Sequence, residues 1–408
     1  MKAPESAPGA AVDGPLRGVR ILDMATVIAA PFAATLCADL GADVVKLEVP
    51  DGSDALRTLA PVTDAHALHW KVTNRGKRGI SLDVRTPRGR DLLLRLLPHF
   101  DVLVENFRTG TLDRWGLDLA TLQAANPRLT VLRLTGFGQT GPYAARPGFA
   151  RIFEAMSGFA HLAGEPEGRP QHMNYPLGDM VAGLFGAFAI AAAMVERRAE
   201  PQMPGREIDL SATEAMLRLV ETLAVERELL GQVRQRSGPR ATYTAPSNIY
   251  RSADKRWLTI VGSSEAIFKR LCGAIGRPEL ATDPRFASNP ARVRNLDAID
   301  GVIAAWCESR EFSAVAAALD EHQVPFSKIY DIEDVLADPH LQTRRAIVRL
   351  PDAELGSVPA PCIVPRFSGL DPAVPVTGPG VGEHNTQVYG AVGVDASELA
   401  TLKAQGVV

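Results

Sequence analysis

The sequence predicts an α/β protein in which a doubly wound, Rossmann-like parallel sheet domain is joined to a smaller α+β domain. Over residues 1–160, short β-branched runs alternate with helical patterns, which is typical of parallel βαβ units. After about residue 247, a hairpin pattern is followed by several helices, which indicates a separate α+β unit. The length of 408 residues leaves room for two or three compact units at roughly 150 residues each.

The first half of the chain supplies the elements of the parallel sheet. We expect a helix at residues 31–40, which stops at Gly41. Strands are expected at residues 20–23, 42–48, 101–105 and 129–134. A further helix is expected after Thr86, because a threonine followed by Pro87 is a typical helix start. The segment from Glu207 to Leu230 predicts another strand and then a long helix, capped by Ser211 or Thr213.

Residues 180–195 carry no charge, and Asp179 stands directly before them. This run of 16 residues is short of the roughly 18 expected of a membrane-spanning helix, so it predicts a helix buried on all sides. Further on, over residues 232–246, Gly, Pro and Arg crowd a stretch without periodicity, which is typical of a linker.

These patterns divide the chain into five parts. We expect a flexible tail at 1–14, a large domain at 15–230, a linker at 231–246, a small domain at 247–323, and a second linker with a return to the large domain at 324–408. The hairpin of the small domain is expected to turn at Ala253 and Asp254.

The composition argues against several classes of partner. Lys and Arg number 44 against 47 Asp and Glu, and the formal net charge of −3 favours neither nucleic acid nor an anionic membrane. The 4 cysteines lie far apart without a CxxC pair, and no HxxxH or HExxH spacing occurs, so neither a disulfide scaffold nor a metal site is expected. The N-terminal residues lack the pattern of a signal peptide, which predicts a cytoplasmic protein.

A glycine-rich run from Gly136 to Gly141, GFGQTG, matches the GxGxxG pattern of dinucleotide-binding proteins and follows a predicted strand. A dinucleotide site needs a helix that opens on the last glycine, whereas Pro142 and Pro147 bracket a loop here. The run is better explained as a tight turn.

Asp179 is the most informative single residue. Its carboxylate is expected at the positive end of a helix dipole, among bulky apolar neighbours. An N-cap is the simpler interpretation, since aspartate is a preferred residue there. A carboxylate nucleophile would need the same position, where it is partly desolvated for reactivity but stabilised by the helix so that it stays ionised.

Several segments point to one family when they are taken in order. They are GVRILDMATVIAAPFAATLCADLGADVVKLEVP, NRGKRGISLDVRTPRGRDLL, DVLVENFRTGTLDRWGLDLATLQAANPRL, GFGQTGPY, LGDMVAG and GEHNTQV. From Gly14 to Val408 the chain resembles the class III CoA-transferase family of CaiB/BaiF type, which includes formyl-CoA transferases, carnitine CoA-transferases and α-methylacyl-CoA racemases. The resemblance implies that Asp179 is the nucleophile of a transferase.

The resemblance also implies that CoA lies at the carboxyl ends of the N-terminal strands. The positions that match those lining the nucleotide and pantetheine are Val27, Ala29, Leu82, Arg85, Asn106, Phe107 and Arg114. The two arginines could pair with phosphates, while the leucine and the phenylalanine could cover an adenine. Each has a simpler alternative, because the arginines could be solvated surface charges and the two apolar residues could be core.

Two departures from the family narrow the activity. Racemase members carry a His-Asp pair where this chain has Phe149 and Ala150, so proton shuttling by that pair is not expected. Formyl-CoA transferases carry consecutive glycines where this chain has SGPRATYTAP, which argues against oxalate as acceptor. The pattern PGFARIFEAMSG is similar to members that use succinyl-CoA with C4 or C5 dicarboxylates such as mesaconate, itaconate or citramalate, and Arg151 within it is the candidate ligand of the second carboxylate.

The resemblance therefore implies a CoA-transferase that works through an aspartyl anhydride and an aspartyl-CoA thioester. Its partners would be a small-molecule acyl-CoA and a carboxylic acid, with CoA as substrate and no permanently bound cofactor, and the chain would form an interlocked homodimer. Three alternatives stay open: an acyl-CoA racemase or epimerase of the same family, a catalytically silent CoA-binding protein, and a nicotinamide dehydrogenase, against which the glycine-free first crossover argues.

Overall fold

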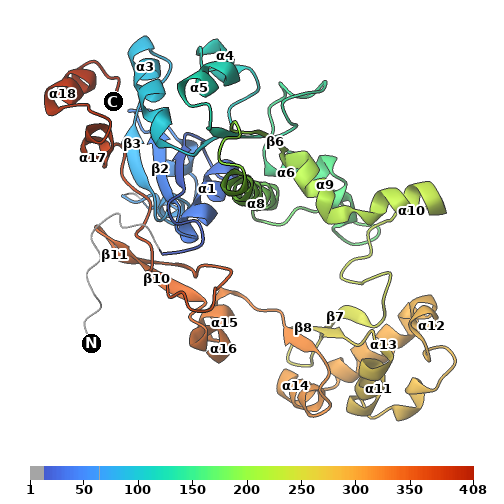
Figure 1. The fold of residues 1–408 in the computed structure, drawn as a ribbon. Coiled ribbons are helices and arrows are strands. Elements are labelled where there is room, and N and C mark those ends of the chain that lie inside the picture. The colour runs from blue at the N-terminus through green and yellow to red at the C-terminus, as the bar shows by residue number, and fades with distance from the viewer. Residues whose placement is uncertain (1–12, 64) are drawn as a thin grey trace. The chain divides into compact units, whose positions relative to one another are not determined.

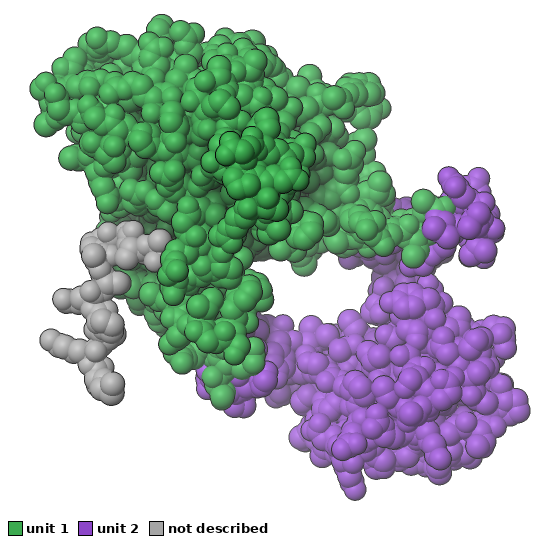
Figure 2. All heavy atoms as spheres, in the orientation of Figure 1, with its two compact units in different colours: residues 1–159, 172–224, 343–408 green, residues 160–171, 225–342 purple. Residues whose placement is uncertain are grey.

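The computed structural model describes residues 13–63 and 65–408, and the chain divides into two compact units (Figures 1 and 2). Unit 1 takes its described residues from the ranges 1–159, 172–224 and 343–408, and unit 2 from 160–171 and 225–342. The tail expected at residues 1–14 lies outside the described residues, apart from its last two.

A fully parallel sheet of six strands forms the centre of unit 1 (Figure 1). Its order is β3-β2-β1-β4-β5-β6, with the strands β1 Arg20–Asp23, β2 Asp43–Glu48, β3 Arg78–Ser81, β4 Val102–Glu105, β5 Thr130–Thr135 and β6 Glu207–Ser211. The predicted doubly wound sheet is confirmed. Because the order reverses between β1 and β4, the carboxyl ends of these two strands flank the point at which such sheets bind ligands.

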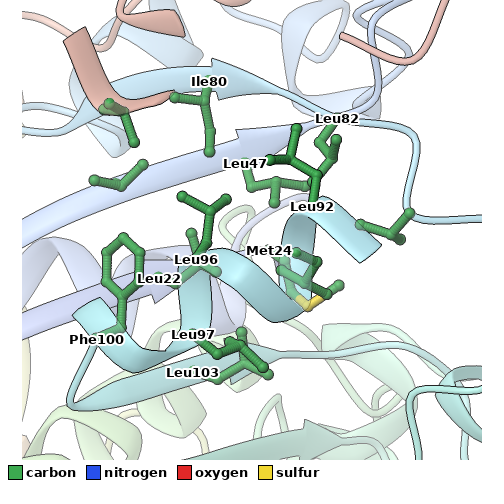
Figure 3. Close-up of a cluster of buried hydrophobic side chains, with 14 of the residues drawn as sticks. Leu22, Met24, Leu47, Ile80, Leu82, Leu92, Leu96, Leu97, Phe100 and Leu103 are labelled. Atoms are coloured by element: carbon green, nitrogen blue, oxygen red, sulfur yellow. The ribbon is translucent and has the colours of Figure 1, made fainter. Parts of the chain in front are cut away.

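Each face of the sheet is covered by its own hydrophobic core. On β1, Ile21 belongs to one core and Leu22 to the other, because successive side chains of a strand point to opposite faces. Figure 3 shows the core on the side of Leu22, where leucines of one helix pack on the strands. The helices that supply residues to this core include α3 Pro87–Leu96, α5 Leu119–Ala125, α17 Asn385–Gly390 and α18 Ala396–Ala404. Those of the opposite core include α1 Ala29–Asp39, α8 Leu177–Ala199 and α9 Ala212–Leu217.

Local rules predicted the start of two helices. At α3, Thr86 accepts a hydrogen bond from the backbone N–H of Gly89 at 3.0 Å, and Pro87 is the first helical residue. At α9, Ser211 is the capping residue, while the hydroxyl of Thr213 donates to the carbonyl of Gly136 at 2.8 Å. The prediction of one long helix after Ser211 is wrong, because the segment is divided into α9, a 3-10 turn η3 Arg218–Val220 and a second helix α10 Thr222–Leu230.

Helix α8 contains the charge-free run and extends over 23 residues, so by length and composition alone it could cross a membrane. One face packs closely on α1, where a Cβ added at Gly183 would lie 2.6 Å from the Ala29 carbonyl oxygen. The opposite face holds Leu184, Phe188 and Val195, which are 60%, 71% and 67% exposed. The expectation of a helix buried on all sides is therefore wrong for a single chain, because a helix layered on a sheet buries only the stripe that faces the sheet.

Unit 2 holds an antiparallel sheet in the order β7-β8-β9, formed by β7 Ser247–Arg251, β8 Trp257–Val261 and β9 Phe326–Lys328. The predicted hairpin is confirmed, since Arg251 pairs with Trp257 across a turn that contains Ala253 and Asp254. A separate core joins this sheet to α11 Glu265–Ala274, α13 Leu296–Glu308 and α14 Phe312–Glu321. Residues 232–246 form neither helix nor strand.

The remaining elements are short. In unit 1 they are η1 Ala55–Arg57, α2 Leu68–Thr73, η2 Leu97–His99, α4 Thr111–Arg114, α6 Ala150–Met156, and the hairpin of β10 Ile347–Asp352 with β11 Gly356–Pro361, for which the sequence indicated no element. In unit 2, or at its borders, they are α7 Phe159–Leu162, η4 Pro278–Ala281, α12 Asn289–Arg294, α15 Ile332–Ala337 and α16 Pro339–Thr343.

Candidate active site

Asp179 is the third residue of α8 and does not cap it. The N-cap position is Pro176, and no side chain makes a capping hydrogen bond there, so the interpretation of Asp179 as an N-cap is wrong. The side chain is half-buried, and burial together with the negative charge of Glu154 raises the pKa of Asp179 to about 7. Burial and Glu154 thus favour the neutral form of Asp179, whereas a helix N-terminus favours the ionised form.

Glu154 and His172 lie beside the first turn of α8, and sequence reasoning missed both. Glu154 belongs to α6 and is 1% exposed. One of its carboxylate oxygens accepts the backbone N–H of Gly178 at 3.2 Å, and the other lies 2.7 Å from Nδ1 of His172. A carboxylate from another helix thus takes one of the N–H groups that the start of α8 leaves unpaired. The signal that could have identified Glu154 is an acidic residue directly after the apolar pair Ile152 and Phe153.

Glycines allow α6 and α8 to approach one another. A Cβ added at Gly178 would lie 2.7 Å from the carbonyl oxygen of Ala150, and one added at Gly136 or Gly148 would collide with the ring of Phe153 at 2.6 and 2.5 Å. Residues 136–141 form a turn in which two glycines have positive φ, as the interpretation of GFGQTG as a tight turn predicts. This turn therefore packs directly on α6, the helix that carries Glu154.

The β1–α1 loop also reaches the start of α8. Val27 has a φ of 65° and donates its N–H to Asp54 at 3.1 Å. Val27 and Met180, the residue after Asp179, pack on the same small cluster, which consists of Ile28, Leu56 and Trp70. The carbonyl of Ala29 lies against Gly183, which is one helical turn after Asp179 on α8. The structure thus brings the predicted residues Val27 and Ala29 to the same end of α8 as Asp179.

Asn106 joins the loops after β1 and β4. Its side-chain oxygen accepts the N–H of Thr26 at 2.8 Å, and its side-chain amide donates to the Thr26 carbonyl, also at 2.8 Å. Both hydrogen-bonding groups of the side chain are used to hold the loop that carries Val27. Asn106 is therefore placed at the switch point between β1 and β4.

The two predicted apolar residues that could cover an adenine differ in burial. Leu82 is fully buried within the core of Figure 3, so its side chain is not placed to cover an adenine. Phe107 is half-buried, with its ring edge-on to Trp115 at 5.0 Å.

The two predicted arginines are both exposed. Arg85 pairs with Asp83 through two contacts of 2.7 and 2.9 Å. Arg114 donates to the Thr111 hydroxyl at 2.8 Å, and it has no ion pair within the described residues.

Arg151 lies on α6, directly after Ala150, and its side chain is exposed. Across residues 13–63 and 65–408 it makes neither an ion pair nor a hydrogen bond through its guanidinium. It therefore presents an uncommitted positive charge one helical turn from Glu154.

Beneath the β1–α1 loop lies a fully buried group of charges. Asp23 contacts Nζ of Lys77 at 2.8 Å and Nζ of Lys46 at 3.7 Å, and all three side chains are fully buried. Lys77 also donates to Asn74 and to the Pro31 carbonyl. These bonds connect β1, β2, α1 and the end of α2 below the loop that faces Asp179.

Comparison with known proteins assigns a family to this arrangement. Residues 16–385 match the sequence profile of CoA-transferase family III. The chain is 39% identical to succinyl-CoA–D-citramalate CoA-transferase of Chloroflexus aurantiacus, over 97% of this chain and 98% of the relative. It is 36% identical to the beta subunit of succinyl-CoA–L-malate CoA-transferase of the same organism, again over 97% and 98%.

A solved structure agrees with these sequence matches. A CaiB/BaiF family protein from Brucella suis superimposes with a TM-score of 0.81 at 32% identity, covering 93% of this chain and 100% of the other. The resemblance noted in the sequence is thereby confirmed. The chain belongs to CoA-transferase family III and is an enzyme of that family.

Proposed function

We propose that this enzyme transfers CoA from succinyl-CoA to a C4 or C5 dicarboxylic acid, with Asp179 as the nucleophile. The ionised carboxylate attacks the thioester carbonyl and releases CoA thiolate, which leaves a mixed anhydride of Asp179 and succinate. The thiolate then attacks the aspartyl carbonyl, so that succinate leaves and an aspartyl-CoA thioester remains. The acceptor carboxylate repeats these two steps in reverse, and the products are the new acyl-CoA and free Asp179.

One observation carries this proposal: Asp179 is a half-buried carboxylate whose pKa of about 7 sets it apart from an ordinary surface aspartate. A desolvated carboxylate is a stronger nucleophile than a hydrated one, and near neutral pH a substantial fraction of Asp179 is ionised. The same burial limits access of water, which would otherwise hydrolyse the anhydride and waste the thioester energy.

The substrates are inferred from the relatives and from Arg151. The named relatives use succinyl-CoA with citramalate or malate, and a third, from Agrobacterium fabrum, is a succinate–glutarate CoA-transferase at 33% identity. All of these acids carry two carboxylates. The free guanidinium of Arg151 supports a role in holding the carboxylate that does not react, so mesaconate, itaconate and citramalate are the acceptors to test first.

We place CoA across the carboxyl ends of β1 and β4. Val27 and Ala29 would line the pantetheine near Asp179, with Asn106 holding their loop, and Phe107 would follow toward the nucleotide. Arg85 and Arg114 are proposed to pair with phosphates, for which Arg85 would exchange its bond to Asp83. Leu82 would contribute through the position of its backbone, since its side chain belongs to the core.

We further propose that the chain works as a homodimer in the cytoplasm. The exposed apolar face of α8, which consists of Leu184, Phe188 and Val195, supports this assembly because an unpaired face of this kind is typical of an interface. Interlocked chains would not separate on dilution short of unfolding. Sizing at nanomolar concentration tests this, and a monomer peak would contradict it.

The decisive experiment traps the covalent intermediate. The enzyme is incubated with succinyl-CoA and hydroxylamine, and the peptide that contains Asp179 is analysed by mass spectrometry for an aspartyl hydroxamate. Asp179→Asn is the matched control and should show none. An unmodified Asp179 peptide in the wild-type enzyme would contradict the mechanism. A screen of free acids with succinyl-CoA then identifies the acceptor.

A further inference from the structure

We propose that Glu154 and His172 form a positioning pair for Asp179, in which Glu154 holds the first turn of α8 and His172 balances the charge of Glu154. The inference rests on the proposed role of Asp179 as nucleophile. In this proposal both residues act on the reaction through Asp179 and not by contact with the substrate.

The geometry ties Glu154 to the backbone beside the nucleophile. Glu154 accepts the N–H of Gly178, the residue directly before Asp179, at 3.2 Å. Since Pro176 provides no side-chain cap, this bond substitutes for the cap that α8 lacks. The glycine is required because any side chain at position 178 would meet the backbone of Ala150. The carboxylate of Glu154 thereby fixes where the first turn of α8, and with it Asp179, lies relative to α6.

A buried carboxylate next to a carboxylate nucleophile is costly unless its charge is balanced. Glu154 is 1% exposed, and of the described ionisable partners His172 is the one with which it makes an ion pair, at 2.7 Å. In its protonated form His172 offsets the charge of Glu154, so that less repulsion opposes ionisation of Asp179. The side chain of His172 is 28% exposed, so it lies between the buried carboxylate and solvent.

Other titratable groups lie on the elements around the start of α8. They are Arg151 on α6, Tyr175 before α8, Glu214 on α9, Cys37 and Asp39 at the far end of α1, and Lys46, Asp54, His69 and Lys71 around the small cluster that Met180 contacts. Of all these charges, Glu154 is the one that raises the pKa of Asp179, alongside burial. A change in the charge of the Glu154–His172 pair should therefore change the pKa of Asp179.

The test measures the rate of hydroxamate formation at Asp179 as a function of pH in single turnovers with succinyl-CoA. Glu154→Gln keeps an acceptor for the Gly178 N–H but removes the charge, so the acidic limb should move to lower pH by at least about 0.5 unit, or about threefold in rate on that limb. His172→Gln keeps a donor but cannot carry the charge, so the limb should move the other way by a similar amount. His172→Lys should restore it toward the wild-type position.

The double variant separates a positioning pair from two independent effects. If His172 acts through Glu154, adding His172→Gln to Glu154→Gln should move the limb by less than about 0.2 unit. His66→Gln is the matched control, because His66 forms a similar pair with Glu354, at 3.2 Å, on an exposed side chain away from α6. It should leave the limb unchanged.

The outcomes distinguish this inference from the proposed function. A hydroxamate at Asp179 with the same acidic limb in all variants would overturn the pair but leave the nucleophile in place. No hydroxamate in the wild-type enzyme would overturn both. If Glu154→Gln fails to fold, as judged by its unfolding midpoint, the contrast between a shifted limb in His172→Gln and a limb near the wild-type position in His172→Lys decides the matter.

Discussion

Among the buried acidic side chains of unit 1, the group around Asp23 and the group around Asp179 differ in how their charge is compensated. In the Asp23 group, the carboxylate is fully buried and lies 2.8 and 3.7 Å from two buried lysines. In the Asp179 group, the charge that acts on Asp179 is another carboxylate, Glu154, and the positive partner of that carboxylate is a histidine. With Asp54, which lies 4.0 Å from Nζ of Lys46, the first group balances two carboxylates against two lysines. The second group holds negative charge that the fold compensates only in part.

The difference separates a structural role from a chemical one. Paired charges inside a protein keep their ionised forms and hold the elements they connect, and breaking such a pair is strongly destabilising. A carboxylate without a cation is shifted toward its neutral form and is reactive when it ionises. Asp23 and Lys77 hold the base of the β1–α1 loop, and the same fold presents Asp179 to that loop with its pKa raised to about 7.

The largest expected effect concerns activity. Asp179→Ala should abolish turnover, because no other group can form the anhydride, while CoA binding should stay within about tenfold, since the proposed nucleotide contacts lie elsewhere. Steady-state rates and calorimetric titration with CoA measure the two quantities. A soluble, CoA-binding variant that retains full turnover would place Asp179 outside the chemistry, and the comparison of the two groups would lose its meaning.

The next effect should appear in stability. Asp23→Asn leaves Lys77 buried without an anion, and Lys46 with Asp54 alone at 4.0 Å. The free energy of unfolding of unit 1 should therefore fall by about 3 kcal/mol or more. Denaturant titration followed by circular dichroism measures the change. An unfolding free energy equal to that of the wild-type protein would show that the Asp23 group is not a compensated cluster.

The third prediction concerns Arg151, a cation on the same helix as Glu154 of the Asp179 group. Arg151→Ala should raise the KM of a dicarboxylic acceptor by about ten- to a hundredfold, which corresponds to a lost charge-assisted contact of about 1.5 to 3 kcal/mol. The KM of a monocarboxylic acceptor should change little, and Arg151→Lys should retain part of the preference. Equal losses for both kinds of acceptor would assign Arg151 to structure rather than to selection of the acid.

The smallest expected effect is a gain in stability from a substitution of Asp179, whereas the substitution of Asp23 should lower stability. The pKa of Asp179 rises from 3.8 to about 7 on folding, so the folded protein binds a proton that the unfolded chain releases, and stability falls as pH rises between these values. Asp179→Asn removes this cost and should stabilise the protein by about 1 to 3 kcal/mol above pH 7, with no gain near pH 4. Unfolding midpoints at several pH values test this, and a loss of stability at pH 8 would contradict it.

The sequence by itself determined the elements that depend on local chemistry. Five of the six strands of the parallel sheet were predicted from short apolar runs, whereas β3, with the sequence RGIS, was missed because it is short and carries a glycine. Thr86 with Pro87 predicted the start of α3, because capping involves only residues within one turn. The hairpin at Ala253 and Asp254 was predictable for the same reason. Even Asp179 was identified from its place at the start of an apolar helix, although the function assigned to it came from resemblance to a family.

Only the tertiary structure decided what surrounds these elements. Glu154 and His172 are 18 residues apart in the chain, and Glu154 reaches the backbone beside Asp179 because Gly178 lets α6 approach α8, a contact that no local pattern encodes. The exposed stripe of Leu184, Phe188 and Val195 was likewise hidden in a uniformly apolar run, since composition does not tell which side of a helix meets the sheet. Local propensity acts between neighbours in sequence, whereas the charge and solvation of a side chain depend on groups that only the packed fold brings together.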